Sequence, residues 1–377
     1  MNPNSKIWKV ALWGNFNNFR LLKKLQKTTL KDYFDKTDNW IYGRGLNADS
    51  DNPDFVPSQM IKTECIERYF TDPDTSTQSN TKFYRKNNEQ LFYPPFVIFK
   101  EGQHNTEISC SLFEKKRYCT TGAFIINTTD EKLDEKKFLV SYLNSDIAKY
   151  ILFLTASSWG IERERVLLNE LLELPSPFFS IDSDILKNIA NAFDKIILLK
   201  KSAICNDAEI KKQEQYIFNE FIKHFSLSDR EVALIEDTMS FGLGLFKAGH
   251  NSIGFRRTQL SENIKYAETL LSSTTKVSAT ISDVQSNDPL NLVILHFGKE
   301  VKEIEIKNIS ELRKQLQEID QYTIQKKAHS IYVQKHIKYY NKDTVYLIKP
   351  NQKRFWTRTQ AMEDASSLIA DIINMAK

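Results

Sequence analysis

Five residues in the first half of the chain have the types and settings needed to contact nucleic acid. They are Arg44 in YGRGL, Lys100 in FVIFKEG, and Trp159, Arg163 and Arg165 in SSWGIERERV. A guanidinium can donate paired hydrogen bonds to phosphate or guanine, and neighbouring glycines let the backbone approach a ligand closely. A lysine at a strand end can reach phosphate, and an exposed indole offers a flat face. We therefore treat these five as candidate DNA-binding residues.

A structural alternative stays open for these segments. YGRGL is also compatible with an ordinary turn. Glu162 to Arg165 could form the solvated first turn of a helix, with local ion pairs of modest value. Arg163 and Arg165 diverge on such a turn, so only one of them could face a given partner.

A second group of basic residues lies near the C-terminus, in YLIKPNQKRFWTRTQ. Thr357 and Gln360 have the spacing of a capping box, which places the start of a helix beside these cations. Helix amides and the helix dipole favour anions at that position, so the segment is a possible anion or nucleic-acid platform. The alternative is a capped helix with its tryptophan in the core. The platform residues are Lys349, Lys353, Arg354, Trp356 and Arg358.

Motifs for catalysis within this chain are weak. GLGLF at 242–246 lacks the features of a phosphate-binding loop. Tyr93-Pro-Pro-Phe96 is similar to the Asn/Asp-Pro-Pro-aromatic loop of amino-methyltransferases, but Tyr93 cannot accept hydrogen bonds from a target amino group as a carboxamide or carboxylate does. We expect Pro94 and Pro95 to lead into a strand instead. Asp288, Glu300 and Lys302 have the spacing of a nuclease active site, but such spacing is common by chance in a chain rich in Lys and Glu.

Composition indicates a globular protein with local basic surfaces. The 377 residues are 41% hydrophobic and carry a net charge of only +4, but residues 1–45 hold nine Lys or Arg against three Asp. The four cysteines form no C-x-x-C pair, which argues against a zinc ribbon. Apolar runs such as YILFL are too short to cross a bilayer, and the N-terminus has no apolar signal region. We expect a cytoplasmic protein with no membrane partner.

The periodicity predicts a mixed α+β fold in three parts. Residues 1–180 are expected to form a β-rich recognition domain, 181–258 a helical spacer for docking a partner, and 259–377 a smaller α+β domain. Expected strands in the first part are KVALWG, FVIFK and AFIIN. Expected helices cover 135–155, 166–174, 184–201, 207–224 and 359–376, and Ser228 with Glu231 forms a capping box.

The chain resembles the C-terminal target-recognition region of gamma-class N6-adenine DNA methyltransferases, especially type IIG-like restriction–modification enzymes. The most specific stretch is YLNSDIAKYILFLTASSWGIERERVLLNELLELPSP at 142–177. The other stretches are 8–25, 94–102, 185–201 and 218–237. The catalytic half of that family is missing, because the chain has neither a cofactor glycine loop nor Asn-Pro-Pro-Tyr.

The resemblance implies that residues 1–180 recognise a short sequence in double-stranded DNA. In that family a methyltransferase domain modifies adenine with S-adenosylmethionine. The missing half implies either that a separate methyltransferase or anti-phage effector supplies the chemistry, with S-adenosylmethionine bound to that partner and no cofactor in this chain, or that the recognition module serves another use. The 71–90 segment is expected to meet DNA beside Arg44 and Lys100, and Trp159 to act as an aromatic wedge at a flipped or distorted base step. Two other functions remain open: a protein-interaction scaffold, and a nuclease through the C-terminal domain.

Overall fold

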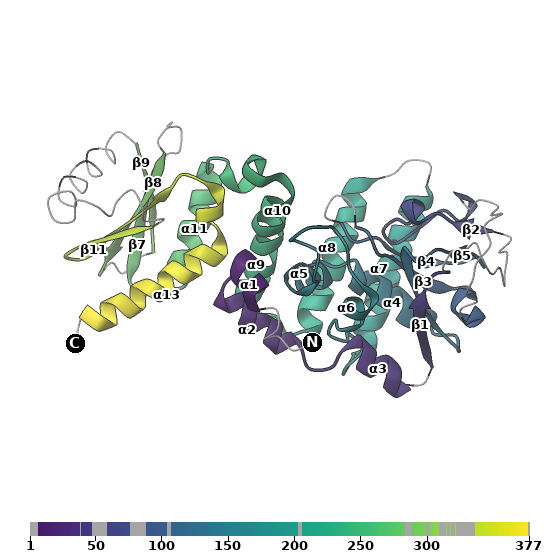
Figure 1. Ribbon diagram of the computed structural model, residues 1–377. Coiled ribbons are helices and arrows are strands. Elements are labelled where there is room, and N and C mark those ends of the chain that lie inside the picture. Colours follow the sequence, from purple (N-terminus) through teal and green to yellow (C-terminus); the bar gives the residue numbers. More distant parts are fainter. Residues whose placement is uncertain are drawn as a thin grey trace. The chain divides into compact units, whose positions relative to one another are not determined.

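The computed structural model describes residues 7–37, 39–46, 59–75, 88–103, 107–202, 206–282, 289–298, 302–308, 314, 317, 321 and 336–375. It divides into two compact units, Met1–Met239 and Ser240–Lys377. Both combine helices with sheets, which confirms the α+β class (Figure 1). The predicted spacer is shared between them: residues 181–239 belong to the first unit and residues 240–258 to the second.

A four-stranded antiparallel sheet with the order β1-β6-β3-β4 forms the centre of the first unit. Its strands are β1 (Trp40–Arg44), β3 (Phe96–Lys100), β4 (Cys110–Phe113) and β6 (Ala123–Thr128). Every residue of β3, β4 and β6 is buried, so these strands are covered on both faces. The predictions for FVIFK and AFIIN are confirmed.

Helices cover one side of this sheet, and short irregular segments cover the other. Helix α4 packs on β3 and β4, and α7 packs on α4 and α8 (Figure 1). The opposite core includes Phe96, Ile98 and Ile125, together with residues of the 3-10 segment η4 and of the short β2-β5 pair. The bounds are α4 (Leu133–Leu143), α7 (Ser183–Lys201), α8 (Asp207–His224), β2 (Met60–Ile61), β5 (Tyr118–Cys119), η2 (Thr63–Cys65), η3 (Pro73–Thr75) and η4 (Glu89–Phe92).

The single helix predicted over 135–155 is two helices, α4 and α5 (Asp146–Thr155), separated at Asn144 and Ser145. Ser145 caps α5 by accepting a hydrogen bond from the Ala148 amide. The Asn144 side chain donates to the carbonyl oxygens of Cys110 and Val140 and accepts from the Cys110 amide. The turn therefore fastens the helices to the edge strand β4.

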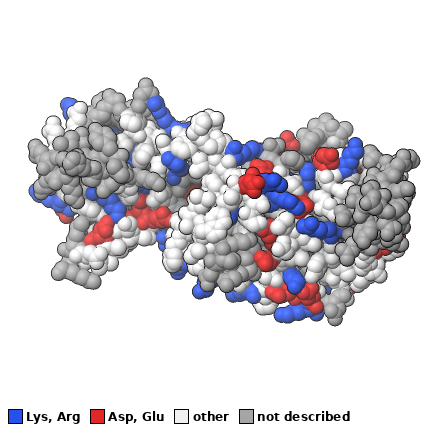
Figure 2. Space-filling model, viewed as in Figure 1, with Lys and Arg blue, Asp and Glu red and all other residues white. Residues whose placement is uncertain are grey.

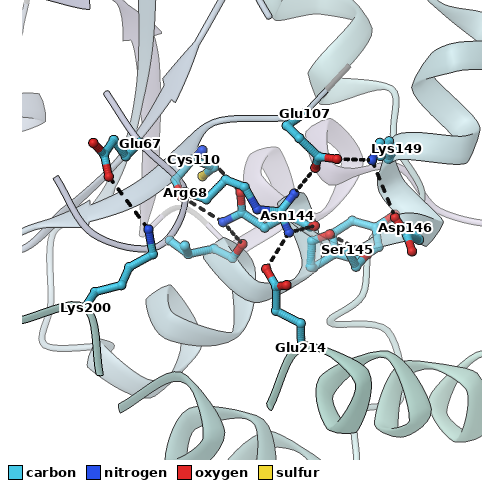
Figure 3. Close-up of polar contacts among 12 residues, drawn as sticks. Glu67, Arg68, Glu107, Cys110, Asn144, Ser145, Asp146, Lys149, Lys200 and Glu214 are labelled. Carbon is cyan, nitrogen blue, oxygen red and sulfur yellow. Dashed lines mark hydrogen bonds and ion pairs between the residues drawn. The ribbon is translucent and has the colours of Figure 1, made fainter. Parts of the chain in front are cut away.

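Charged side chains surround this turn (Figure 3). Arg68 pairs with Glu107 and with Glu214, 2.7 Å away, and it donates to the Asn144 carbonyl oxygen over 3.2 Å. Burial acts to lower the pKa of Arg68, but Tyr69 and the two carboxylates raise it above its usual value. Lys149 bonds Glu107 at 2.8 Å. The cluster is internally paired, which identifies it as a structural tie between loop and helices.

The N-terminal segment is helical, so the strand predicted for KVALWG is wrong. Helix α1 (Ile7–Trp13) places Lys9 and Trp13 one turn apart on the same face. Lys9 donates to the carbonyls of Ala156 and Trp159, and Trp13 Nε1 donates to that of Gly160 over 2.8 Å. These distant partners decide the conformation of a segment whose local pattern is ambiguous.

The remaining helices of the first unit close its core. Asn15 caps α2 by accepting from the Asn17 and Asn18 amides. The predicted box at Ser228 and Glu231 is present at the start of α9, and the predictions of α7 and α8 are confirmed. The leucine stripe predicted over 166–174 forms only a short α6. The bounds are α2 (Phe16–Leu25), α3 (Leu30–Thr37), α6 (Leu168–Leu172) and α9 (Asp229–Asp237).

The second unit is a five-stranded sheet with the order β10-β11-β8-β7-β9, in which only the β7–β9 pair of the described strands is parallel. Helices α11 and α13 pack together and share a core with β7, β8 and β11. The helix predicted over 359–376 is confirmed as α13. The bounds are η5 (Thr238–Leu243), α10 (Gly244–Ala248), η6 (Gly249–Asn251), η7 (Ile253–Phe255), α11 (Leu260–Ser272), β7 (Val277–Ser282), β8 (Leu290–Phe297), β9 (Ile304–Lys307), β10 (Ile337–Asn341), β11 (Thr344–Pro350), η8 (Lys353–Phe355) and α13 (Arg358–Met375).

Candidate nucleic-acid interface

Arg44 is the last residue of β1 and lies beside a close backbone crossing. A Cβ atom on Gly45 would lie 2.0 Å from the Thr120 carbonyl oxygen, so only glycine fits there. The Arg44 guanidinium lies over the Phe124 ring at 5.6 Å, and its Nη2 is 3.5 Å from Glu101 Oε1. The glycine thus allows a close approach between two parts of this chain, and that approach sets the position of the Arg44 side chain.

Glu101 follows β3 directly and connects two distant segments. The backbone pairs Gly102 with Arg165, and the Val166 amide donates to the Glu101 carbonyl oxygen over 3.0 Å. The Glu101 side chain is only 9% exposed. Its Oε1 accepts hydrogen bonds from Arg165 Nε at 2.9 Å and Nη2 at 2.6 Å. A buried carboxylate thus holds two of the predicted arginines, Arg44 and Arg165.

The segment before Arg165 is anchored at both ends. Lys9 and Trp13 fix the carbonyls of the small-residue junction, and Gly160 adopts φ +80°, where a Cβ would come within 2.8 Å of the Phe153 ring. Glu170 ties the two ends of the segment together, because its carboxylate accepts from the Ser157 amide at 2.6 Å and from the Leu167 amide at 2.9 Å. The abrupt change of residue type in SSWGIERERV therefore corresponds to a loop with a rigid base and an exposed tip.

An open cleft of about 550 Å³ lies between these segments. We call it the Glu101 cleft. Its charged lining residues are Glu64, Lys100, Glu101, Arg163, Glu164 and Arg165. Arg44 adjoins it through Glu101. In the view of Figure 2, Lys and Arg side chains of the first unit are likewise interspersed with Asp and Glu side chains. The cleft therefore presents hydrogen-bond donors and acceptors together.

The other two predicted cations of this region also reach the cleft. Lys100 is buried, and its Nζ is 3.5 Å from the Glu64 carbonyl oxygen. The Arg163 side chain is 69% exposed, and its ion pair at 3.4 Å is with the equally exposed Glu162. Arg163 is thus available to an external partner, whereas Lys100 is partly committed to the protein. The structure brings Arg44, Lys100, Arg163 and Arg165 together. Residues 76–87 of the predicted 71–90 loop lie outside the described part of the chain.

Trp159 does not lie on this surface, which corrects the prediction of an aromatic wedge. Its side chain is fully buried and packs edge-on against Phe153 at 6.4 Å. The neighbouring chain turns at Gly160 and directs the indole into the core formed with α1 and α5. An indole is amphipathic, so its presence beside charged residues did not reveal which side it faces.

Two of the five residues of the predicted platform in the second unit are internal, which corrects that part of the prediction. Lys349 and Trp356 are buried, Lys349 is paired with Asp364, and the Trp356 indole donates to the Pro350 carbonyl oxygen over 2.9 Å. Lys353 pairs with Glu262 at 2.6 Å, and Arg354 lies over the Phe255 ring at 4.1 Å. Arg358 opens α13 and is half-buried. Carboxylates therefore neutralise Lys349 and Lys353, and the buried Lys349 and Trp356 cannot belong to a surface platform. An anion contact through Arg354 and Arg358 stays a prediction.

Glu101 is the site residue that the sequence-based interpretation missed. It follows Lys100 in FVIFKEG, where only the basic residue was predicted to belong to the site. A carboxylate placed directly after a fully buried strand was the available signal, because a buried charge requires an ionic partner. Its partners are 57 and 64 positions away in sequence, at Arg44 and Arg165.

Gly45→Ala is expected to destabilise the protein by about 1 to 3 kcal/mol and to displace Arg44, because the new methyl group collides with a backbone oxygen. Urea denaturation followed by circular dichroism measures the change. Gly102→Ala is the matched control, because a Cβ there meets nothing within 4 Å. Equal stability of the two variants would contradict the close approach of the Gly45 backbone to the Thr120 carbonyl oxygen.

A second cleft, of about 530 Å³, adjoins Tyr93, Pro94 and Pro95. Asn127 Nδ2 donates to the Tyr93 carbonyl oxygen, and Lys136 Nζ donates to that of Pro95, both over 2.8 Å. Burial lowers the pKa of Lys136. These bonds hold the Pro-Pro segment against the start of β3 and favour the structural interpretation of that motif.

No group of His, Cys, Asp or Glu among the described residues has a metal-binding arrangement. Of the alternative nuclease set, Asp288 and Glu300 lie outside the described residues, and Lys302 donates to the Leu271 carbonyl oxygen over 2.7 Å. Among the helices of the described region, none has the length and apolar character required to cross a bilayer.

Comparison with known proteins gives distant structural similarities. No family model and no curated protein matches the chain. One similar solved structure is the type IIL restriction–modification enzyme MmeI in complex with DNA, with a TM-score of 0.30 and 12% identity over 39% of this chain and 21% of MmeI. Another is the type IIG restriction endonuclease BpuSI, with a TM-score of 0.33 and 12% identity over 58% of this chain and 34% of BpuSI. The chain thus spans about a fifth and a third of these enzymes.

Proposed function

We propose that this chain is a sequence-specific DNA-recognition module of a restriction–modification or anti-phage defence system. The observation that carries the proposal is the Glu101 cleft. Arg44, Lys100, Arg163 and Arg165 come from three separate segments, yet they converge around one buried carboxylate. The sequence resemblance of 142–177 to target-recognition regions supports the same function.

The proposed division of labour assigns base modification or cleavage to a separate chain. This chain would provide contacts to the phosphate backbone that set register and a few contacts to base edges that give specificity. A partner adenine methyltransferase or defence effector would carry S-adenosylmethionine or the cleavage site. Neither partner is required for the basic property tested first, which is binding of duplex DNA by the chain alone.

Duplex binding is expected to weaken steeply with salt, because neutralising phosphates releases condensed counterions. The test is fluorescence anisotropy with a labelled random-sequence duplex at ionic strengths from about 50 mM to about 200 mM. We expect the logarithm of the binding constant to fall linearly with the logarithm of the salt concentration. Failure to bind duplex DNA even at the lowest salt would overturn the proposed function.

Arg163→Ala is expected to weaken duplex binding and to reduce the salt slope by about 1, since one phosphate contact is lost. Thermal stability should stay unchanged, because the side chain is 69% exposed and its ion pair within the described part of the chain is with an exposed glutamate. Lys212→Ala is the matched control: it removes one exposed cation, 75% accessible, from α8, away from the cleft. An equal loss of binding in both variants would show that total charge, rather than the cleft, determines affinity.

A further inference from the structure

We propose that Arg165 recognises a guanine base of the DNA target and that Glu101 is its positioning residue. This inference rests on the proposed DNA-binding function and specifies how the Glu101 cleft would discriminate between sequences. It assigns different tasks to two arginines that share one carboxylate. Arg165 would contact a base, and Arg44 would contact the phosphate backbone.

Two hydrogen bonds to Glu101 orient the Arg165 guanidinium. Its Nε and Nη2 both donate to Glu101 Oε1, at 2.9 and 2.6 Å. Among the described residues, Nη1 has no hydrogen-bond partner, and the side chain is 41% exposed. The Nε–Nη2 edge of the planar group is therefore fixed to the protein, while the end of the group keeps one N–H of Nη1 and the second N–H of Nη2. These two parallel N–H donors match the O6 and N7 acceptors of guanine in the major groove.

Backbone contacts hold Glu101 and Arg165 in place. Glu101 is 9% exposed, and the backbone on either side of it pairs with Gly122 and with Val166. The Arg165 backbone itself pairs with Gly102 in the same bridge. The donor edge is therefore held by a short chain of contacts that ends in the central sheet. Such pre-organisation reduces the entropy lost on binding and makes a single base contact selective.

Arg44 and Arg165 differ in how closely they contact Glu101. Arg44 Nη2 lies 3.5 Å from Glu101, beyond the distance of a strong charge-assisted hydrogen bond, while both Arg165 contacts are short. Arg44 also stacks over Phe124 and keeps 44% of its side chain exposed. Glu101 therefore holds Arg44 less closely than it holds Arg165, so Arg44 is the arginine that we assign to the phosphate backbone.

The Glu101 cleft is lined by side chains of both charge signs. Its lining combines Lys100, Arg163 and Arg165 with Glu64, Glu101 and Glu164. A site built only to hold phosphate would favour cations, since every carboxylate repels the backbone. Base edges, in contrast, carry both donors and acceptors. The mixed lining therefore fits the edges of bases better than it fits the backbone alone.

The experiment selects bound duplexes from a random library with the full chain, and then measures affinities for the enriched duplex and for unrelated duplex at one salt concentration. We expect an enriched guanine whose replacement by 7-deazaguanine or another base lowers wild-type affinity by about 5- to 150-fold. Arg165→Lys keeps the charge but loses the fork, so it should abolish this preference and change affinity for unrelated duplex by less than about 2-fold.

The same binding measurements are made with two further variants, Glu101→Gln and Arg44→Ala. Glu101→Gln removes a negative charge from the cleft and loosens Arg165, so we expect weaker guanine preference together with tighter binding to unrelated duplex. A purely structural role for Glu101 would lower both affinities. Arg44→Ala should weaken binding to every duplex by a similar factor. Circular dichroism melting confirms that each variant is folded.

Two results would overturn the inference while leaving the proposed function intact. One is an enriched sequence whose guanine preference survives Arg165→Lys, and the other is an enriched sequence in which no guanine is required. Absence of any duplex binding by the wild-type chain would overturn both the inference and the proposed function. Loss of guanine preference in Arg165→Lys and Glu101→Gln, with retention in Arg44→Ala, would support the assignment.

Discussion

Replacing Trp159 with alanine is expected to lower the free energy of unfolding by about 3 to 5 kcal/mol, the typical cost of emptying a tryptophan site in a core. The side chain is fully buried, and it lies between the helix that supplies Phe153 and the junction held by Lys9. The resulting cavity cannot collapse easily, because hydrogen bonds fix the Trp159 and Gly160 carbonyls. Urea denaturation followed by far-ultraviolet circular dichroism measures the loss.

Trp159→Phe distinguishes packing from polar contacts at this position. Among the described residues the indole Nε1 has no hydrogen-bond partner, so phenylalanine removes no such bond and leaves a smaller void. We expect its cost to be about 1 to 3 kcal/mol, clearly below that of alanine. Arg163→Ala, four residues along the same loop, should leave stability unchanged. A stable Trp159→Ala protein that had lost DNA binding would instead restore the wedge role.

Local periodicity was sufficient for the elements whose environment is uniform along their length. Strands β3 and β6 are apolar runs buried on both faces, and α7, α8 and α13 are long enough to show a repeating apolar face. Their predictions hold because the sheet core and the helical layer impose the same pattern that the sequence displays. Ser228 and Glu231 were also predictable, since a capping box depends on residues only three positions apart.

Long-range contacts decided the features that sequence reasoning missed. The conformation of α1 depends on carbonyl acceptors 147 to 150 residues away, and no local pattern contains that information. The same applies to the Glu101 cleft. The cations Arg44 and Arg165 could be proposed from their settings, but the carboxylate that joins them became apparent only when β3 and the 164–166 segment were seen side by side. The sequence therefore predicted the hydrogen-bond donors of the candidate site but missed Glu101, the carboxylate that holds two of them.

Asp364→Ala in the second unit is expected to cost about 3 to 5 kcal/mol, because it leaves a buried cation without its counter-ion. Lys349 is 2% exposed. Besides Asp364, its Nζ bonds the Tyr266 hydroxyl at 3.1 Å and the Phe355 carbonyl oxygen at 3.3 Å. The same carboxylate accepts a hydrogen bond from Tyr266, so the substitution breaks two buried contacts at once. Urea denaturation of the wild type and the variant measures the difference.

The pH dependence separates this charge effect from simple loss of volume. Burial lowers the pKa of Lys349, and the Asp364 charge opposes that shift. Without Asp364 the folded-state pKa falls further below the unfolded value, so between these two values the unfolded chain binds more protons and stability rises with pH. The deficit of Asp364→Ala should therefore shrink as the pH rises between these two values. Lys349→Met combined with Asp364→Leu removes both charges and should recover most of the stability. A pH-independent deficit that the double variant retains would mean that packing, rather than the ion pair, holds α13 against the sheet.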